Sequence, residues 1–298
     1  MAKLTFLGTS SMVPTKERNH VSCLLNYEDE NILIDCGEGT QRQIKIANIS
    51  PTKITKILIS HWHGDHILGL PGLLQTMAAS QYNKQLEIYG PKGSSYFMKK
   101  IMEIFIHDNK LNIKLTEITK DGKFFENKKF YLEAKKLKHS TDCIGFSLIE
   151  KDKRKINVPY LKKFNLKNDP IIKNLQNGKS IKFKGKFIDV KKATSLVKGK
   201  KITFITDTVY CNECILLAKN ADLLVCESTF DSKLEQNAKD FKHLTAKQAS
   251  LIAKKAKVKK LILTHFSQRY NNIDILKKEA KQIFKDVIFA HDFLVFEL

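Results

Sequence analysis

The segment SHWHGDH at residues 60–66 constrains the fold of this chain most strongly, because it places three histidines and an aspartate within six consecutive positions. It directly follows ITKILIS at 54–60, an apolar run that predicts a buried strand. Alternate side chains of a turning loop project the same way, so His61 and His63 can bind one ion. Gly64 lets the backbone turn so that Asp65 and His66 face a second ion. Imidazole and carboxylate are common zinc ligands. The loop therefore predicts half of a two-metal site at a strand end.

Three further ligand-type residues also stand at strand ends. His139 follows FYLEAKKLK, Asp207 ends KITFITD, and His265 follows KKLILT. If these strands are neighbours, their ends meet at one edge, where active sites are commonly built. We expect His61, His63 and His139 on the first ion, Asp65, His66 and His265 on the second, and Asp207 between them. Seven ligands that leave open positions for water are typical of a catalytic site. Three of the four other histidines, His20, His107 and His291, match no ligand position and are treated as ordinary.

The hydrophobic pattern predicts an α/β protein. Strands are expected over 3–8, 20–27, 31–37, 54–60, 85–90, 130–140, 143–151, 201–208, 221–229, 259–267 and 286–298. Helices are expected over 40–48, in the second half of 67–80, and over 245–257. Hairpin and alternating patterns together favour sheets that are covered by helices. We expect one domain over 1–298.

The charge of the chain is strongly uneven. It has 52 Lys and Arg against 31 Asp and Glu, a net charge of +21, and residues 151–200 alone hold 16 basic against 3 acidic residues. A lysine-rich composition with only four arginines is also typical of coding bias, but the concentration in one segment favours a polyanionic partner. Residues 151–192, which hold two prolines and two glycines, predict a protruding insertion rather than a separate core.

The six cysteines do not predict a disulfide framework in a chain of this length. Cys211 and Cys214 form a C-x-x-C without a second pair, which favours small buried thiols over a metal or redox role. A redox role would require a lowered thiol pKa. The apolar run at 67–74 is too short to cross a bilayer, and the first residues lack a secretory pattern, so we expect a cytoplasmic protein without a membrane segment.

Several segments, in order and spacing, resemble the tRNase Z family of the metallo-β-lactamase superfamily. They are FLGTSSMVPTKERN, IDCGEGTQRQ, SHWHGDHILGLPGLL, HSTDCIGFSLIEKDK, ITDTVYCNECILLAKNADLLVCESTF and HLTAKQASLIAKKAKVKKLILTHFSQRY. The resemblance covers nearly the whole chain, and GLPGLL after the histidine motif is its most specific part. It implies an αβ/βα sandwich, in which two packed β-sheets carry helices outside, with a protruding basic arm.

The resemblance also implies the activity. It implies a zinc-dependent endoribonuclease, with two Zn²⁺ per subunit, that cleaves precursor tRNA after the discriminator nucleotide and leaves a tRNA 3′-OH and a trailer 5′-phosphate. Asp65 would be both a ligand and the group that orients or deprotonates the attacking water, rather than a ligand only. His243 would assist the leaving group or hold the phosphate, unless it only neighbours a helix start.

Further expectations concern RNA binding. Lys16 and Arg18 would sense the 3′ end of the tRNA, unless they are plain surface charges. The arm at 151–192 would be flexible and clamp the tRNA for the other subunit's site, which implies a homodimer. Two other functions remain open on the residues alone: a small-molecule phosphodiesterase or arylsulfatase on the same fold, and a tRNA-binding protein with an inactive site. Relatives that act on messenger RNA carry a large inserted domain, for which 298 residues leave no room.

The chain departs from the family pattern at three places. Thr206 and Val209 flank Asp207 and Thr208 where the family has Gly-Asp-Thr-Arg, and Leu244 follows His243 where it has Ser. The segment CESTF at 226–230 stands where His-Glu-Ala-Thr-Phe is common. No expected metal ligand is lost, so we expect these changes to affect the surroundings of the ligands rather than metal binding itself.

Overall fold

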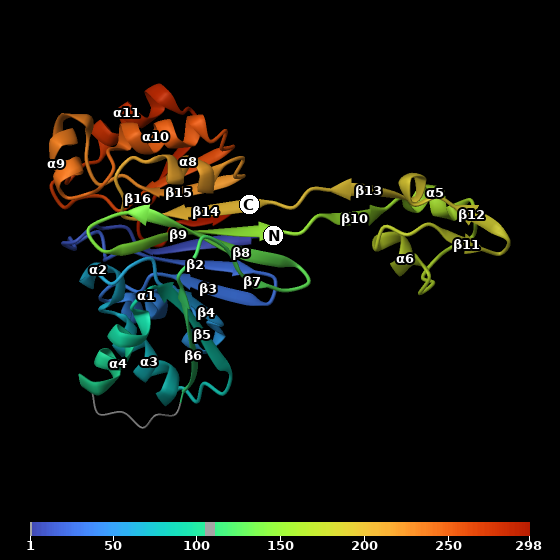
Figure 1. Cartoon of the computed structure of the whole chain (residues 1–298), viewed down its shortest axis with the longest axis horizontal. Helices are drawn as coiled ribbons and strands as arrows, with labels where there is room; N and C mark the ends of the chain where they lie inside the picture. The colour runs from blue at the N-terminus through green and yellow to red at the C-terminus, as the bar shows by residue number, and fades with distance from the viewer. Residues whose placement is uncertain (1, 105–110) are drawn as a thin grey trace.

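Two seven-stranded β-sheets form the centre of the protein (Figure 1). The structure is a computed structural model and describes residues 2–104 and 111–298. The first sheet has the order β18-β1-β2-β3-β4-β5-β6 and the second has the order β17-β16-β15-β14-β9-β8-β7. In the first sheet β3, β4, β5 and β6 are parallel, and in the second β14, β15, β16 and β17 are parallel.

The first sheet and its helices come mainly from the N-terminal half of the chain. Its strands are β1 (Ala2–Gly8), β2 (Ser22–Tyr27), β3 (Glu30–Ile34), β4 (Lys56–Leu58), β5 (Gln85–Pro91), β6 (Asn112–Ile118) and β18 (Val295–Glu297). Its helices are α1 (Thr40–Ile46), α2 (Gly64–Ile67), α3 (Leu70–Ala79) and α4 (Ser94–Ile104). The apolar residues of this sheet's outer face pack against α1 and α3 in one buried cluster, which includes Leu33, Ile44 and Leu73.

The second sheet comes from the part of the chain that follows β6. Its strands are β7 (Gly122–Glu126), β8 (Phe130–Lys138), β9 (Asp142–Glu150), β14 (Lys201–Ile205), β15 (Leu223–Glu227), β16 (Lys260–Thr264) and β17 (Val287–Phe289). Its helices are α8 (Asn212–Ala218), α9 (Glu235–Asp240), α10 (Ala246–Lys255) and α11 (Asp274–Ile283). In α10 the apolar residues recur at helical spacing, and a capping box between Thr245 and Gln248 fixes its start.

The two sheets share one interior. A buried cluster joins Leu4, Phe6 and Leu25 of the first sheet to Phe146 and Ile202 of the second. Helices cover the outer face of each sheet, and the layers are seen edge-on in Figure 1. The expected αβ/βα sandwich is therefore confirmed. Because the inner faces of both sheets are apolar, the ends of the strands are the places where polar side chains can gather.

The C-terminal segment differs from its prediction. Residues 286–298 were expected to form one strand, but β17 pairs with β16 in the second sheet and β18 pairs with β1 in the first. The chain crosses between the sheets at His291 and Asp292, and the Asp292 carboxylate accepts hydrogen bonds from Thr9 Oγ1, Asn19 N and Gln43 Nε2 at 2.8, 2.8 and 3.0 Å. The two ends of the chain therefore lie side by side in one sheet.

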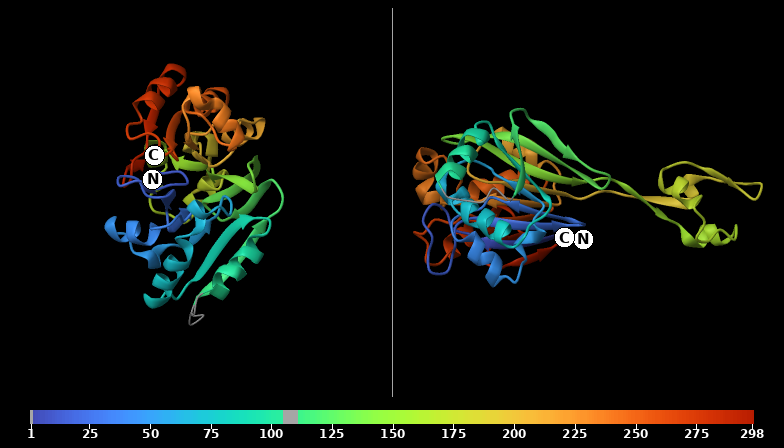
Figure 2. Two further views of the ribbon diagram at one scale, coloured as in Figure 1. Left: turned by 90° about the vertical axis from the view of Figure 1, so that its left-hand side faces the viewer. Right: turned by 90° about the horizontal axis from the view of Figure 1, so that it is seen from below.

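Residues between β9 and β14 form an arm that extends away from the sandwich (Figure 2). Its stalk is the antiparallel pair β10 (Lys153–Ile156) and β13 (Thr194–Val197). Beyond the stalk lie α5 (Val158–Lys162), α6 (Ile172–Gln176), the hairpin β11 (Ile181–Phe183) and β12 (Lys186–Ile188), and α7 (Val190–Ala193). Leu161, Leu175 and Ile188 are buried in a small core there. The expected protrusion is present, but the expectation that it lacks a core of its own was wrong.

All six cysteines are buried and are free thiols in the structure. Among the described residues, no helix has both the length and the apolar character that a bilayer crossing needs. His107, one of the histidines expected to be ordinary, lies outside the described residues.

Candidate metal centre

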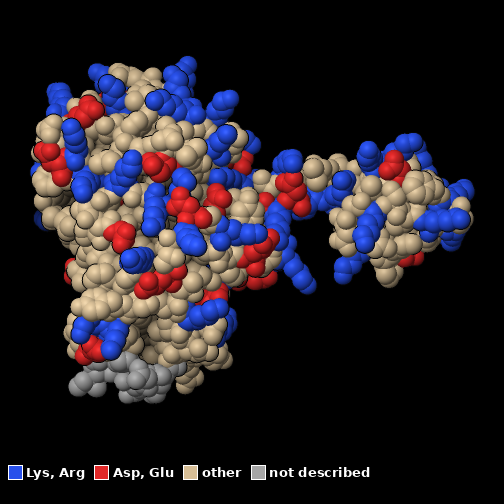
Figure 3. All heavy atoms as spheres, viewed as in Figure 1, with Lys and Arg blue, Asp and Glu red and all other residues tan. Residues whose placement is uncertain are grey.

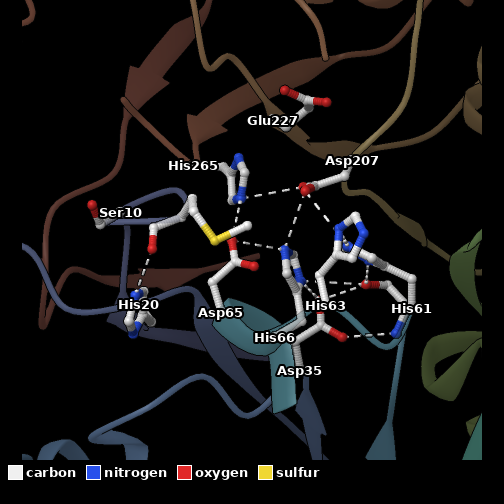
Figure 4. Close-up of polar contacts among 12 residues, drawn as sticks. Ser10, His20, Asp35, His61, His63, Asp65, His66, Asp207, Glu227 and His265 are labelled. Atoms are coloured by element: carbon white, nitrogen blue, oxygen red, sulfur yellow. Dashed lines mark hydrogen bonds and ion pairs between the residues drawn. The ribbon is translucent and has the colours of Figure 1, made fainter. Parts of the chain in front are cut away.

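All seven predicted ligands meet at one end of the sandwich, and Figure 4 labels all of them except His139. His61, His63, Asp65 and His66 lie between β4 and α3, beside the first sheet. His139, Asp207 and His265 follow β8, β14 and β16 of the second sheet. Strands β8 and β14 are both antiparallel to β9, so they end at the same edge, as expected. The sandwich thus supplies the two halves of the site from two different sheets.

The ligand atoms form two groups that share one residue. His61, His63, His139 and Asp207 form the first group, and Asp65, His66, Asp207 and His265 form the second. Asp207 Oδ2 lies 3.6 Å from His61 Nε2 and 3.3 Å from His66 Nε2, whereas its Oδ1 lies 3.2 Å from His265 Nε2. The structure therefore brings all seven residues together, with Asp207 between the groups in the place where a bridging ligand was expected.

Hydrogen bonds fix which nitrogen of each histidine faces the centre. Nδ1 of His66 donates to Asp35 Oδ2 at 2.7 Å, and Nδ1 of His139 donates to the Lys242 carbonyl at 2.9 Å. Nδ1 of His265 lies 2.9 Å from Thr229 Oγ1, whose own hydrogen goes to Glu227. Because each Nδ1 carries the proton, each Nε2 keeps a lone pair for a metal.

His61 and His63 of the first group are also oriented by contacts with their neighbours. His61 Nδ1 lies 3.0 Å from Ser60 Oγ, whose hydroxyl donates to Asp35 Oδ2 at 2.8 Å. This arrangement leaves His61 Nε2 free, and it lies 3.1 Å from His63 Nδ1, which in turn lies 3.2 Å from His139 Nε2. A tetrahedral ion with bonds of roughly 2.0–2.1 Å to nitrogen separates its ligand atoms by about 3.4 Å. The spacing of the three nitrogens is therefore close to that of a zinc site.

Four buried atoms of the second group make no hydrogen bond in the structure: Asp65 Oδ1, His66 Nε2, Asp207 Oδ1 and His265 Nε2. Buried polar atoms nearly always have a hydrogen-bond partner, and several unpaired atoms side by side would raise the free energy of the folded protein. A bound cation would satisfy all of them. The residues present therefore fit a metal at both groups.

Two residues at the centre have unusual backbone conformations. Asp35, which directly follows β3, has a φ of 55°, and His265, which follows β16, has a φ of 61°. Such left-handed conformations are disfavoured for residues with a side chain and collect at functional sites. Asp35 was not predicted as a site residue, although it orients both His61 and His66. The only signal in the sequence was its place at the end of a predicted strand.

An open cavity of about 480 Å³ lies over the centre. Its lining includes the expected residues His63, Asp65, His139, Asp207 and His243, together with Met12, Phe230, Phe241 and Arg269. Arg269, which the sequence did not single out, is the basic side chain of this lining. Lys16 and Arg18 are not part of it. Lys16 is exposed, and the Arg18 guanidinium donates to the Tyr270 carbonyl at 2.8 Å, which ties its loop to the segment after His265.

His243 lies beside the second group. Its Nδ1 is 3.2 Å from Glu227 Oε1 and 3.8 Å from Asp207 Oδ2. Burial lowers the pKa of His243, but the Glu227 and Asp207 carboxylates more than offset this and raise the pKa to about 9. His243 thus faces the cavity as a positive charge. Two of the departures from the family pattern have a local place in the structure: Leu244 is fully buried in the core cluster that includes residues of α10, and Val209 N donates to the Lys138 carbonyl at 2.9 Å.

Curated relatives decide the family. A "Ribonuclease Z" of Bacillus cereus (strain B4264) is 39% identical, and the alignment covers 97% of this chain and 97% of that protein. A second, from Protochlamydia amoebophila, is 37% identical and covers 98% of this chain and 95% of that protein. The chain belongs to the ribonuclease Z family. Family membership confirms the expectation of an RNA-cleaving phosphodiester hydrolase.

Solved structures agree with this membership. Human tRNase Z, short form (ELAC1), is 29% identical with a TM-score of 0.73, and the match covers 99% of this chain and 98% of that one. The metallo-β-lactamase fold protein YhfI of Bacillus subtilis, 20% identical with a TM-score of 0.72, supports the fold alone. A family model described as anti-Pycsar protein Apyc1 matches residues 2–289. That match spans nearly the whole chain, so the chain also belongs to the family that this model describes.

Proposed function

We propose that this ribonuclease Z-family enzyme holds two zinc ions and cleaves precursor tRNA on the 3′ side of the discriminator nucleotide. The products would be a tRNA with a 3′-OH and a trailer with a 5′-phosphate. The observation that carries the proposal is the pair of ligand groups joined through Asp207 at the floor of an open cavity. When bound, such ions acidify water and stabilise negative charge on phosphoryl oxygens.

The residues of the chain have distinct tasks in this reaction. Asp65 offers an ionised carboxylate at the cavity, because His66 and His265 overcome the effect of burial and hold its pKa well below the ordinary value. We assign it to orient the attacking water and accept its proton. His243, on the other side of Asp207, carries a proton that it can give to the departing 3′ oxygen. Arg269 lines the same cavity and can bind a phosphate that flanks the cleaved bond.

The experiment is incubation of a 3′-extended precursor tRNA with wild-type protein and the Asp65→Ala variant, followed by mapping of both new ends. Wild-type protein should release the trailer at the discriminator, and Asp65→Ala should lose this activity by about 10³-fold or more. Asp29→Ala is the control, since the Asp29 side chain is 93% exposed on a surface turn. Zinc content, measured in parallel, should be two per chain for wild type. Cleavage at other positions, or equal activity of Asp65→Ala, would contradict the proposal.

The arm supports an RNA substrate over a small phosphodiester. Its lysines spread over its surface with few acidic residues among them (Figure 3). Basic side chains on an extended element bind a phosphate backbone without reading its sequence. A small-molecule phosphodiesterase or arylsulfatase has no use for such a surface. We therefore assign the arm to hold the tRNA body, with Lys16 and Arg18 near the 3′ end of the substrate.

The position of the arm favours action on a partner subunit. It leaves the sandwich where β9 ends and β14 begins (Figure 1). His139 and Asp207 follow the C-terminal ends of β8 and β14, which lie at the opposite edge of the same sheet. An arm that projects away from its own site serves a second site better than its own. We propose a homodimer in which each arm presents tRNA to the other subunit, and a cytoplasmic location where precursor tRNA is available.

A further inference from the structure

Two thiols, those of Cys211 and Cys214, lie in contact shortly after Asp207 in the chain. Sγ of Cys211 and Sγ of Cys214 are 3.4 Å apart, and both thiols are free. Cys214 is fully buried within α8, whereas Cys211 lies in the loop before this helix and is 6% exposed, next to the exposed Asn212. The pair is the C-x-x-C of the sequence, and the proposed RNA cleavage makes no use of it.

Cys211 differs in reactivity from the other cysteines, whereas contact with Cys211 and burial raise the pKa of Cys214. The hydrogen bond from Cys214 lowers the pKa of Cys211 to about 7, although burial acts in the opposite direction. Burial raises the pKa of Cys23, Cys36 and Cys226, so these stay as thiols. The thiolate is the nucleophile in reactions with peroxides and disulfides. A reactive thiolate in contact with a second thiol is the arrangement that forms an intramolecular disulfide readily.

We propose that Cys211 and Cys214 are an oxidation site, at which hydroperoxides convert the thiol pair into a disulfide that slows RNA cleavage. The chemistry takes two steps. The Cys211 thiolate attacks the O–O bond of the hydroperoxide, forms a sulfenic acid and releases one water or alcohol after protonation. The Cys214 sulfur then attacks the Cys211 sulfur, and the sulfenic oxygen leaves as water. The peroxide is reduced by two electrons, and the two thiols are oxidised by two.

The disulfide would disturb the metal centre through Thr208. A disulfide brings its two sulfurs to about 2.05 Å, so they must approach by about 1.3 Å from their separation of 3.4 Å. Cys214 is fully buried on the inner side of α8, so Cys211 and its loop must supply most of the movement. Sγ of Cys211 lies 3.9 Å from Thr208 Oγ1, and Thr208 directly follows Asp207.

Thr208 also connects this loop to a second ligand. Its Oγ1 accepts a hydrogen bond from Lys138 N at 3.2 Å, and Val209 N donates to the Lys138 carbonyl at 2.9 Å. Lys138 directly precedes His139. A shift of the 207–211 loop therefore reaches both Asp207 and His139, and changes around metal ligands typically cost about tenfold to a hundredfold in activity. This consequence rests on the proposed function, whereas formation of the disulfide does not.

The experiment treats the metal-loaded, reduced protein with hydrogen peroxide and analyses it by alkylation and peptide mass. Trypsin releases residues 202–219, which contain both cysteines and none of the other four. This peptide should lose two hydrogens and resist alkylation, and precursor-tRNA cleavage should fall about tenfold or more. Dithiothreitol should reverse both changes.

Two variants separate the proposal from general oxidative damage. Cys214→Ser should keep its activity when reduced, form no disulfide, and yield a Cys211 sulfenic acid that dimedone traps. Cys23→Ser, which removes a buried thiol in β2, should behave as wild type. The proposal is overturned if residues 202–219 keep both thiols under peroxide that oxidises free glutathione, or if the disulfide forms and cleavage is unchanged. A reduced protein that cleaves no precursor tRNA would contradict the proposed function instead, and the peptide mass would still decide the disulfide.

Discussion

The metal centre and the arm are built by opposite means. At the centre, side chains from both sheets are buried and each histidine has a hydrogen-bond partner that fixes its ring, so the ligand atoms are arranged before a metal binds. The arm is a thin stalk with a small core, and its lysines are exposed and make few contacts. The difference teaches that cleavage of one phosphodiester bond requires reactive groups in fixed positions. Binding of a long polyanion instead requires an extended element with many positive charges.

The largest expected effect is loss of the residue that joins the two ligand groups. Asp207→Asn keeps the shape of the side chain but removes a negative charge from between the groups. We expect it to lower zinc content and to reduce cleavage of both precursor tRNA and a small phosphodiester by about 10³-fold or more, because both reactions use the same centre. Measurements of kcat/KM on the two substrates check this. A loss on precursor tRNA alone would show that the residue serves RNA binding rather than the chemistry.

Replacement of the arm should affect the two substrates unequally. If residues 153–197 are replaced by a short Gly-Ser turn, we expect precursor-tRNA cleavage to fall about 10²-fold or more while hydrolysis of a small phosphodiester changes little. The reason is that the arm leaves the sandwich at the end away from the ligands, so its removal spares the centre. Equal loss on both substrates would remove the distinction between the two regions.

Mixed dimers sharpen the same test. One protein keeps its arm but carries Asp65→Ala, and the other keeps its metal centre but lacks the arm. Each should be nearly inactive on precursor tRNA by itself. If each arm serves the other subunit, mixing and re-forming dimers should restore activity, since one combination has both parts. A mixture that stays inactive, in samples shown by light scattering or mass photometry to contain mixed dimers, would contradict action on the partner subunit.

The smallest expected effect concerns salt. Lys182, Lys184 and Lys186 are exposed around the β11–β12 hairpin of the arm. Substitution of all three by Gln should weaken binding of precursor tRNA and reduce the slope of log affinity against log salt by about 2–3, because each lost phosphate contact contributes roughly 0.7–0.9. Lys278, Lys281 and Lys285, exposed on α11 or just after it, are the matched control and should leave the slope unchanged when replaced by Gln. An unchanged slope in the arm variant would mean that the hairpin does not contact the tRNA.

The sequence predicted the centre better than the arm, for a physical reason. Each group of ligands lies at or just after the end of an apolar run, and such a run predicts both a strand and the edge where it ends. Asp35 lies near the end of the predicted strand 31–37, yet its role was missed, because a residue that acts through His61 and His66 has no spacing of its own. Asp35 reaches these histidines because β3 pairs with β4, and the residues around Asp35 in the sequence do not indicate this pairing.

The arm was harder to predict because its apolar residues stand singly or in pairs among lysines. Leu161 and Leu175 look exposed in such surroundings, and they are buried only because they pack with Ile181, Ile188 and Ala193, which come later in the chain. The end of the chain was misjudged for a similar reason. The pattern over 286–298 predicts strand throughout, but nothing local indicates that its two halves belong to different sheets. Long-range contacts, rather than propensity, decided each of these cases.

The pairing of β18 with β1 also has a consequence for synthesis of the protein. β1 can complete its pairing only after β18 has been made, because Lys3 pairs with Glu297, and Asp292 ties together the loops of Thr9 and Asn19, which are made long before it. His265 is likewise made long after His61. A nascent chain that does not yet include His265 therefore lacks the full set of candidate ligands.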